Sequence, residues 1–210
     1  MIKNVFYFLM MIVMLLDTTS ILAQSDEPIP SNEPQHVVAV LQNALIEAMR
    51  QGGKMRHEDR ESFLAPVILE THDLATIVRT TLGAHWPTLD KTQQQSMLKT
   101  FAQHSIATYA SRFNQYGGEQ FEIMDNQPLP RERILVRSQF IKADKGIISF
   151  DYVLHQQNGH WLIINIVVDG VSDLALKRAE YNAIMQQEGI QSLIDTLQHK
   201  TDQIKLEHQQ

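Results

Sequence analysis

The sequence predicts an α+β fold, with one domain in which helices cover a four-stranded antiparallel sheet. Up to about residue 118, apolar residues recur every three to four positions, which is the period of amphipathic helices. From about residue 119 to 169, apolar and polar residues alternate between short turns, and a helical period returns afterwards. Helices followed by a meander of strands and then by further helices indicate a single α+β domain.

Four helical segments are expected before the sheet, separated by residues that favour helix ends. The first carries an apolar stripe over Val37–Met49, and the second runs from about His57 to Leu69. The fourth is the longest, and its stripe includes Phe101, Tyr109 and Phe113. The expected ends are Gly52-Gly53 after the first helix, Thr71 or Asp73 before the third, Gly83 after the third, Asp90 before the fourth, with Gln93 placed for a capping box, and Gly117-Gly118 after the fourth.

Four strands are expected in the second half, joined by short turns. Asp125–Pro130 contains two prolines and is expected to be a turn, and residues 143–146 and 157–159 have the composition of hairpin turns. Consecutive strands joined in this way form an antiparallel meander. The expected strands are Glu119–Met124, Ile134–Lys142, Ile147–Gln156 and Trp161–Asp169.

The last expected strand is unusual because it is apolar on both faces. Between Trp161 and Val168 only Asn165 is polar, which does not suit a strand with one face in water. The strand must therefore be covered on both faces or face a cavity on one side. Gly170 ends it, and Ser172 is placed to cap the next helix. The helices expected after it are Leu174–Gln187 and Ile190–Lys200, separated by Gly189.

The N-terminus has the pattern of a signal peptide for export. The apolar run Val5–Leu16 is too short to span a bilayer, which takes about 20 apolar residues. Ala23 is the best cleavage position, Ser25 is an alternative, and an uncleaved membrane anchor is the competing interpretation. The chain has no cysteine, so a lipoprotein anchor and disulfides are excluded. The expected segments are a signal peptide at 1–23, a mobile leader at 24–34, a single domain at 35–200 and a polar tail at 201–210.

Composition and motifs argue against several classes of function. The formal net charge is −6 and no basic stripe occurs, which disfavours binding to nucleic acid or to anionic lipid surfaces. No Gly-x-Ser-x-Gly motif and no histidine spacing typical of a metal site occur. Asp151 and His155 share one face of a strand and are candidates for an acid–base pair, although together with His160 they are more typical of a solvated edge.

Several short motifs follow one another in a consistent order over roughly residues 36–200. They are Asp73-Leu74, Leu82-Gly83-x-x-Trp86, Phe101, Thr108-Tyr109-Ala110, Asp151-Tyr152-x-Leu154, Gly159-x-Trp161, Asp169-Gly170-Val171-Ser172, Arg178-x-x-Tyr181-x-x-Ile184 and Gly189-Ile190-x-x-Leu193-Ile194. This order resembles the MlaC/toluene-tolerance family of periplasmic lipid-binding proteins that assist ABC transporters. The resemblance implies a cone-shaped, NTF2-like fold with a helical N-terminal part, a curved sheet and one apolar cavity.

The resemblance also implies a function. We expect a soluble periplasmic carrier, not an enzyme and without a cofactor, that holds phospholipid acyl chains or a hopanoid. Its expected partners are an inner-membrane ABC transporter with its substrate-binding membrane subunit and an outer-membrane lipoprotein/porin complex, in outer-membrane lipid homeostasis. An isomerase-type pocket enzyme and an adaptor of an ABC transporter that binds no lipid are the alternatives.

Two stretches favour the hopanoid-associated, HpnM-like branch of this family. They are Ala107-Thr108-Tyr109-Ala110-Ser111-Arg112-Phe113 with Tyr116-Gly117-Gly118-Glu119, and Ser172-Asp173-Leu174-Ala175 with Arg178-Ala179-Glu180-Tyr181. The chain also departs from the family, with Asn165 where an aspartate is usual and His72 where a phenylalanine often stands. Both departures leave the identity of the ligand open.

The candidate walls of the cavity are mostly aromatic and aliphatic. Such stripes alone are more typical of a packed core, and the resemblance favours a cavity instead. Alternation gives each strand two faces but does not indicate which one lines the cavity. Arg112 and Arg178 are the only basic residues expected beside it, so we expect weak selectivity for headgroups and an ion pair between Arg178 and the sheet. The candidate lipid-binding residues are Leu82, Trp86, Phe101, Tyr109, Phe113, Val136, Phe140, Phe150, Tyr152, Ile164, Val168 and Tyr181.

Overall fold

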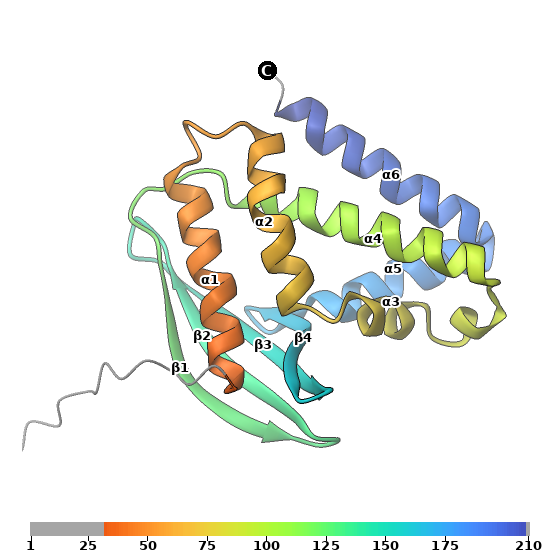
Figure 1. Ribbon diagram of the computed structural model, residues 1–210, viewed down its shortest axis with the longest axis horizontal. Coiled ribbons are helices and arrows are strands. Elements are labelled where there is room, and N and C mark those ends of the chain that lie inside the picture. Colours follow the sequence, from red (N-terminus) through yellow and green to blue (C-terminus); the bar gives the residue numbers. More distant parts are fainter. Residues whose placement is uncertain (1–31, 209–210) are drawn as a thin grey trace, which may run out of the picture.

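The computed structural model describes residues 32–208, and helices make up most of both ends of this range (Figure 1). The predicted signal peptide at 1–23 and most of the predicted leader lie outside the described residues. None of the helices within 32–208 combines the length and the apolar character needed to cross a membrane. The helices are α1 (Pro34–Arg50), α2 (His57–Thr71), α3 (Leu74–Leu82), the short 3-10 helix η1 (Gly83–Thr88), α4 (Lys91–Arg112), α5 (Asp173–Gln187) and α6 (Gly189–Glu207).

The strands form one antiparallel sheet in the order of the chain, as the sequence predicted. A fifth strand of two residues, β5, adds to the predicted four and pairs Val168 with Val171. The α+β fold class is therefore confirmed. The strands are β1 (Gln120–Leu129), β2 (Arg133–Ile141), β3 (Ile147–Gln157), β4 (His160–Val168) and β5 (Val171–Ser172).

The turn predicted at Asp125–Pro130 is wrong, because β1 continues through it to Leu129. The register shifts between Ile123 and Asp125, so a bulge lets the strand carry on. Pro128 fits there because β1 is an edge strand, where a missing N–H costs no ladder hydrogen bond on the open side. The turn comes later, at Arg131 and Glu132, which both have positive φ angles.

Local capping places the helix starts where the sequence predicted them. Asp73 accepts a hydrogen bond from the N–H of Thr76, which decides between the two predicted caps of α3. Asp90 and Gln93 form the predicted capping box of α4, and Ser172 caps α5. The predicted end of the last helix at Lys200 was wrong, because α6 continues to Glu207.

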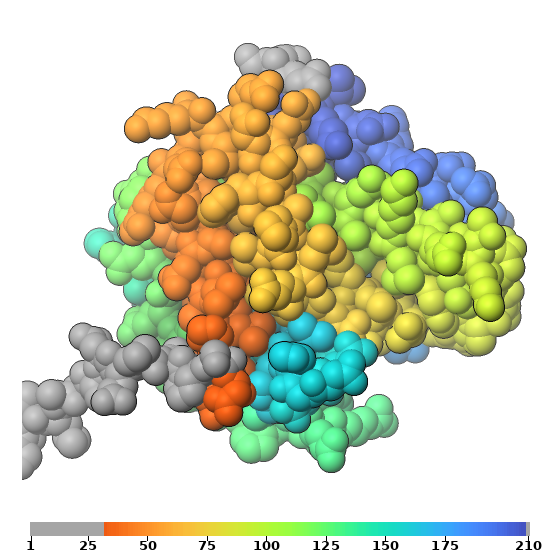
Figure 2. All heavy atoms as spheres, in the orientation of Figure 1, coloured from red at the N-terminus to blue at the C-terminus, as the bar shows by residue number. Residues whose placement is uncertain are grey.

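Two separate clusters of buried apolar residues stabilise the domain. In the first, α1 and α2 pack on the sheet, with Leu41 and Tyr152 fully buried (Figure 2 shows the two helices side by side over the sheet). In the second, α3, α4, α5 and α6 pack together around Phe101 and Leu193. Figure 1 shows α3, α5 and α6 extending beyond the β4 edge of the sheet. The long helix α4 contributes to both clusters.

Candidate functional site

A cavity of about 780 Å³ lies between the two buried clusters. Phe113 and Ile163 of the first cluster line it, and so do Phe101, Tyr181 and Leu197 of the second. Its volume falls within the range of about 300–1,000 Å³ that is usual for ligand sites. The helices α4, α5 and α6 and the strand β4 supply most of its walls.

The cavity has a mouth beside α5 and α6. Its apolar lining is buried or half-buried except for Leu176. The exposed lining residues are Arg112, Leu176, Glu180, Gln203 and Glu207. These five residues lie at the C-terminal end of α4, on α5 and on the C-terminal half of α6. The cavity therefore opens to solvent where these three helices meet.

A bulge explains how β4 presents so many apolar residues to the cavity. Opposite Val153 and Leu154 of β3, strand β4 advances by two residues, from Asn165 to Ile163. The extra residue breaks the alternation of side chains, so Ile163 and Ile164 both line the cavity although they are adjacent. Trp161 does not line it. Because of this bulge, the lining residues of β4 do not follow one face of a regular pleat.

Seven of the twelve candidate residues line this cavity, and five do not. Val136 and Tyr152 are fully buried in the first cluster, and Phe140 packs against it. Leu82 is fully buried in the second cluster, where Trp86 packs against it. These five serve the packing of the two cores. The seven that line the cavity are Phe101, Tyr109, Phe113, Phe150, Ile164, Val168 and Tyr181.

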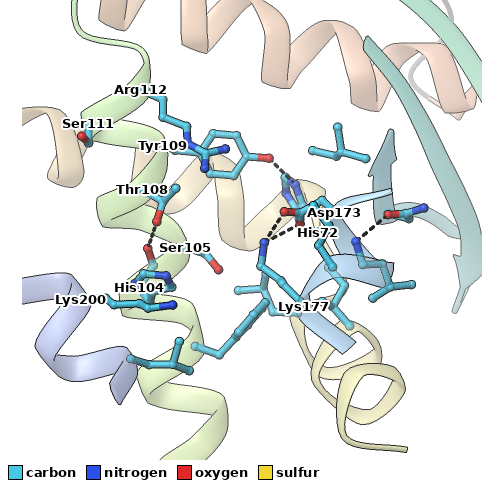
Figure 3. A pocket seen from close by; sticks show the side chains of 18 of the residues that line it. His72, His104, Ser105, Thr108, Tyr109, Ser111, Arg112, Asp173, Lys177 and Lys200 are labelled. Carbon is cyan, nitrogen blue, oxygen red and sulfur yellow. Dashed lines mark hydrogen bonds and ion pairs between the residues drawn. The ribbon is translucent and has the colours of Figure 1, made fainter. Parts of the chain in front are cut away.

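A buried histidine lies in the cavity wall. The His72 Nε2 is 3.1 Å from the Tyr109 hydroxyl oxygen (Figure 3), and its Nδ1 is 3.0 Å from the Thr71 hydroxyl and 3.2 Å from the Ile68 carbonyl oxygen. Because Thr71 already donates its hydroxyl to the Val67 carbonyl, the His72 Nδ1–H donates and the Tyr109 hydroxyl donates to Nε2. Burial lowers the pKa of His72 to about 4, so the ring is neutral at pH 7.

A second histidine, His104, faces the cavity from α4. Its Nδ1 is 3.1 Å from the Thr201 hydroxyl oxygen, and that hydroxyl donates to the Leu197 carbonyl, so the histidine N–H donates to Thr201. This contact ties α4 to α6. Burial, and to a lesser extent nearby cationic side chains, lower the pKa of His104 to about 4.

The basic residues beside the cavity differ from those that the sequence indicated. Arg112, Lys177 and Lys200 line it, whereas Arg178 is exposed and its guanidinium lies beside Gly83. The ion pair predicted between Arg178 and the sheet is not found among the salt bridges of residues 32–208. Lys177 was missed although it lies four residues before Tyr181, which is the spacing that puts two helical residues on one face.

Acidic residues accompany two of these cations. Lys177 pairs with Asp173 one turn earlier on α5 (Figure 3), and Lys200 of α6 pairs with Glu180 of α5. The second pair joins two helices at the mouth. Arg112 has no ion pair within the described part of the chain.

The predicted acid–base pair of Asp151 and His155 does not form. His155 Nε2 is instead 3.0 Å from a carboxylate oxygen of Asp73, the cap of α3. Asp151 accepts hydrogen bonds from the Ser138 N–H at 3.1 Å and the Ser149 hydroxyl at 3.3 Å. In the range that the structure describes, no group of three or more His, Cys, Asp or Glu residues is placed to hold a metal ion.

Asn165 connects the cavity wall to α5. Its side-chain oxygen accepts hydrogen bonds from the Ser172 hydroxyl at 3.1 Å and from the Leu174 N–H at 3.0 Å. The amide therefore holds the start of α5 against β4. A carboxylate at this position would accept the same two hydrogen bonds, so the departure from the usual aspartate removes a charge without removing these contacts.

Comparisons with known proteins agree on one family. The family model described as MlaC protein matches residues 40–199 of this chain. The intermembrane phospholipid transport system binding protein MlaC of Haemophilus influenzae is 23% identical over 126 residues, which cover 58% of this chain. The match spans 59% of that curated relative's length.

The fold also resembles a solved structure. This is the phospholipid-binding protein from Ralstonia solanacearum in complex with a phospholipid. The TM-score is 0.70 at 14% sequence identity, and the match covers 84% of this chain and 99% of the other. At this identity the likeness shows a shared fold.

Proposed function

Because the chain belongs to the MlaC protein family, we propose that it is a phospholipid carrier that shelters acyl chains in the cavity between its two cores. The observation that carries this proposal is the cavity itself. Its buried lining is apolar except for His72, and its charged residues are half-buried or lie at the exposed mouth. This division matches a ligand with an apolar body and a polar head.

The energetics favour such a ligand. Each methylene removed from water contributes about 0.8 kcal/mol, so ten sheltered methylenes contribute about 8 kcal/mol before the cost of ordering the ligand. Few polar contacts are needed to hold a lipid at this strength. A carrier that gives its ligand to a partner also benefits from an open mouth, and the exposed edges of α5 and α6 provide one.

The cargo is proposed to be a glycerophospholipid. The relative from Haemophilus influenzae is described as a phospholipid transport protein, and the Ralstonia solanacearum structure holds a phospholipid. A hopanoid is the second candidate, because stretches such as 107–113 resemble the HpnM-like branch. The two lipids differ in mass and in phosphorus content, so the extract of the purified protein distinguishes them.

The cellular setting belongs to the same proposal. We place the protein in the periplasm after removal of residues 1–23, where it exchanges lipid with an inner-membrane ABC transporter and its substrate-binding membrane subunit. An outer-membrane lipoprotein/porin complex is the proposed partner on the other side. N-terminal sequencing of the exported protein tests the cleavage: a start near Gln24 supports it, and an intact Met1 in the membrane fraction contradicts it.

The alternatives receive less support from the site. An isomerase-type enzyme needs a reactive pair in the pocket, and Asp151 and His155 do not form one. An adaptor that binds no lipid needs no cavity of about 780 Å³. We therefore propose no reaction and no cofactor for this chain.

Blocking the cavity tests the carrier function. Ile164 is 8% exposed and lines the cavity from β4, so Ile164→Trp fills space that an acyl chain needs. We expect lipid extracted from this variant to fall at least tenfold relative to the unaltered protein. Ile147→Trp is the matched control, because Ile147 is 62% exposed on β3 and outside the cavity.

The melting temperature of each variant separates blocked binding from unfolding. If Ile164→Trp remains folded and carries as much lipid as Ile147→Trp, the acyl chains do not occupy this cavity. If neither the unaltered protein nor any variant carries extractable lipid, the carrier function itself is wrong.

A further inference from the structure

Three cationic side chains from three helices face the cavity near its mouth. Arg112 ends α4, Lys177 lies on α5, and Lys200 lies on α6 (Figure 3). The sequence had indicated Arg112 and Arg178 beside the cavity, and the expectation of weak headgroup selectivity depended on that set. Only Arg112 of the two lines the cavity. The three come together only in the folded chain, because α5 and α6 follow α4 after the whole sheet.

The three charges act on the same part of the cavity. Burial and the positive charges of Lys177, Lys200 and Arg112 together lower the pKa of His104 to about 4, against the opposing effect of Glu180. Figure 3 shows Arg112, Lys177 and Lys200 around the part of the cavity that His104 also lines. An anion in this part of the cavity is therefore flanked by cationic side chains from α4, α5 and α6.

The mouth is the place where the polar head of a bound lipid has to lie. Arg112, Glu180 and Glu207 are exposed there, whereas the buried lining is apolar except for His72. Helix α4 hydrogen-bonds to α6 and the residue after it through His104 with Thr201 and Ser111 with His208. Both pairs are 97 residues apart, so the two helices run in the same direction here. This alignment fixes the C-terminal ends of both helices at the same mouth.

We propose that Arg112, Lys177 and Lys200 bind the phosphate of a phospholipid at this mouth, so that the carrier selects lipids with a phosphate over lipids with an uncharged headgroup. The proposal rests on the carrier function above. Arg112 is the central residue, because its guanidinium has no ion pair among the described residues and presents a donor fork that matches phosphate oxygens.

The acidic residues limit how much negative charge the mouth accepts. Asp173 and Glu180 pair with Lys177 and Lys200, and Glu207 also lines the cavity. With neutral histidines, three cationic and three anionic side chains line it, so their formal charges balance. A single phosphodiester adds one negative charge beside Arg112. Headgroups with several negative charges meet the acids as well, and we expect no added affinity from the extra charge.

Short-chain, water-soluble lipids test the proposal without a membrane. Binding of dihexanoyl phosphatidylglycerol and of dihexanoylglycerol to the delipidated protein is measured by titration calorimetry at low salt. Hydrogen bonds to charged groups contribute about 1.5–3 kcal/mol when buried and less when exposed, so we expect the phosphate to improve affinity about tenfold. In Arg112→Gln with Lys177→Gln, this preference falls below about threefold.

Arg178→Gln is the matched control. Arg178 is the neighbour of Lys177 and carries the same charge, but it lies outside the cavity beside Gly83. We expect this variant to keep the tenfold preference. If it loses the preference as well, the effect comes from general surface charge and the proposal is overturned. If the double variant fails to fold, the phosphate preference of Arg112→Gln alone tests the proposal. This single variant should fold, because Arg112 is exposed and has no ion pair in the described chain.

The two lipids also separate this proposal from the carrier function. Equal affinity of the unaltered protein for both lipids overturns the phosphate site and leaves acyl-chain binding intact. Binding of neither lipid, while the folded protein also lacks copurified lipid, refutes the carrier function. Binding of both with a preference that survives in Arg112→Gln places the phosphate elsewhere and also overturns the proposal.

Discussion

Acid should weaken the fold measurably through His72. This side chain is 7% exposed, and burial lowers its pKa from 6.5 to about 4. Because the pKa of His72 is lower in the folded chain, the unfolded chain takes up the proton at a higher pH than the folded one. The contribution of the neutral ring to the free energy of unfolding is therefore fully present above pH 6.5 and is lost as the pH falls toward 4. For these two pKa values, the free energy of unfolding falls by about 2 kcal/mol between pH 7 and pH 5.

The variant His72→Phe with Tyr109→Phe isolates this contribution. It removes the titrating ring together with the hydroxyl that donates to it, so no buried hydroxyl is left without that partner. Urea unfolding followed by circular dichroism at pH 7 and pH 5 gives the loss of stability on acidification. We expect the loss to be about 2 kcal/mol smaller in the double variant than in the unaltered protein.

Tyr109→Phe alone is the control for the pH experiment. It keeps His72 buried but removes the hydroxyl 3.1 Å from Nε2, so it should lose stability at both pH values and keep the pH dependence. All other titrating groups are shared and cancel in the comparison. Equal losses on acidification in the unaltered protein and the double variant would refute the assignment of a buried neutral ring to His72.

Two further predictions concern stability. Ser172→Ala removes the hydroxyl that accepts a hydrogen bond from the Ala175 N–H, so the free energy of unfolding in urea should fall by about 1 kcal/mol. Val171→Ala, at the exposed neighbouring position, should change it little. Equal effects of the two variants would contradict the capping role. Leu41→Ala leaves a cavity in the first core, so the free energy of unfolding should fall by about 2–5 kcal/mol. Leu206→Ala, at an exposed position, should lower it by less than about 0.5 kcal/mol. A loss below about 1 kcal/mol for Leu41→Ala would contradict tight packing in this core.

Local chemistry made the helix starts predictable. Asp73, Asp90 and Ser172 cap helices through hydrogen bonds to residues three positions later, and such short-range contacts are visible in the order of residues. The turn at Asp125–Pro130 was misplaced because prolines also fit an edge strand. Whether β1 is an edge depends on the whole sheet, which no local pattern contains.

The candidate site was predictable in part, for a similar reason. An apolar residue has the same sequence pattern whether it packs in a core or lines a cavity, so Tyr152 and Phe150 could not be separated. The β4 bulge arises from its pairing with β3, and it brings Ile163 to the cavity together with Ile164. Lys177 was predictable from its helical spacing to Tyr181, whereas Lys200 depends on how α6 packs on its neighbours.

Photochemical labelling from inside the cavity tests the central claim most directly. A phospholipid with a diazirine near the end of one acyl chain is loaded into the purified protein, irradiated, and located by peptide mass spectrometry. We predict labels on deep lining residues such as Phe113, which follows α4, and Ile164 of β4, and none on Leu41, which is fully buried in the first core. Labels confined to exposed apolar residues such as Leu69 or Ile147 would contradict the account, because the acyl chain would then lie on the surface.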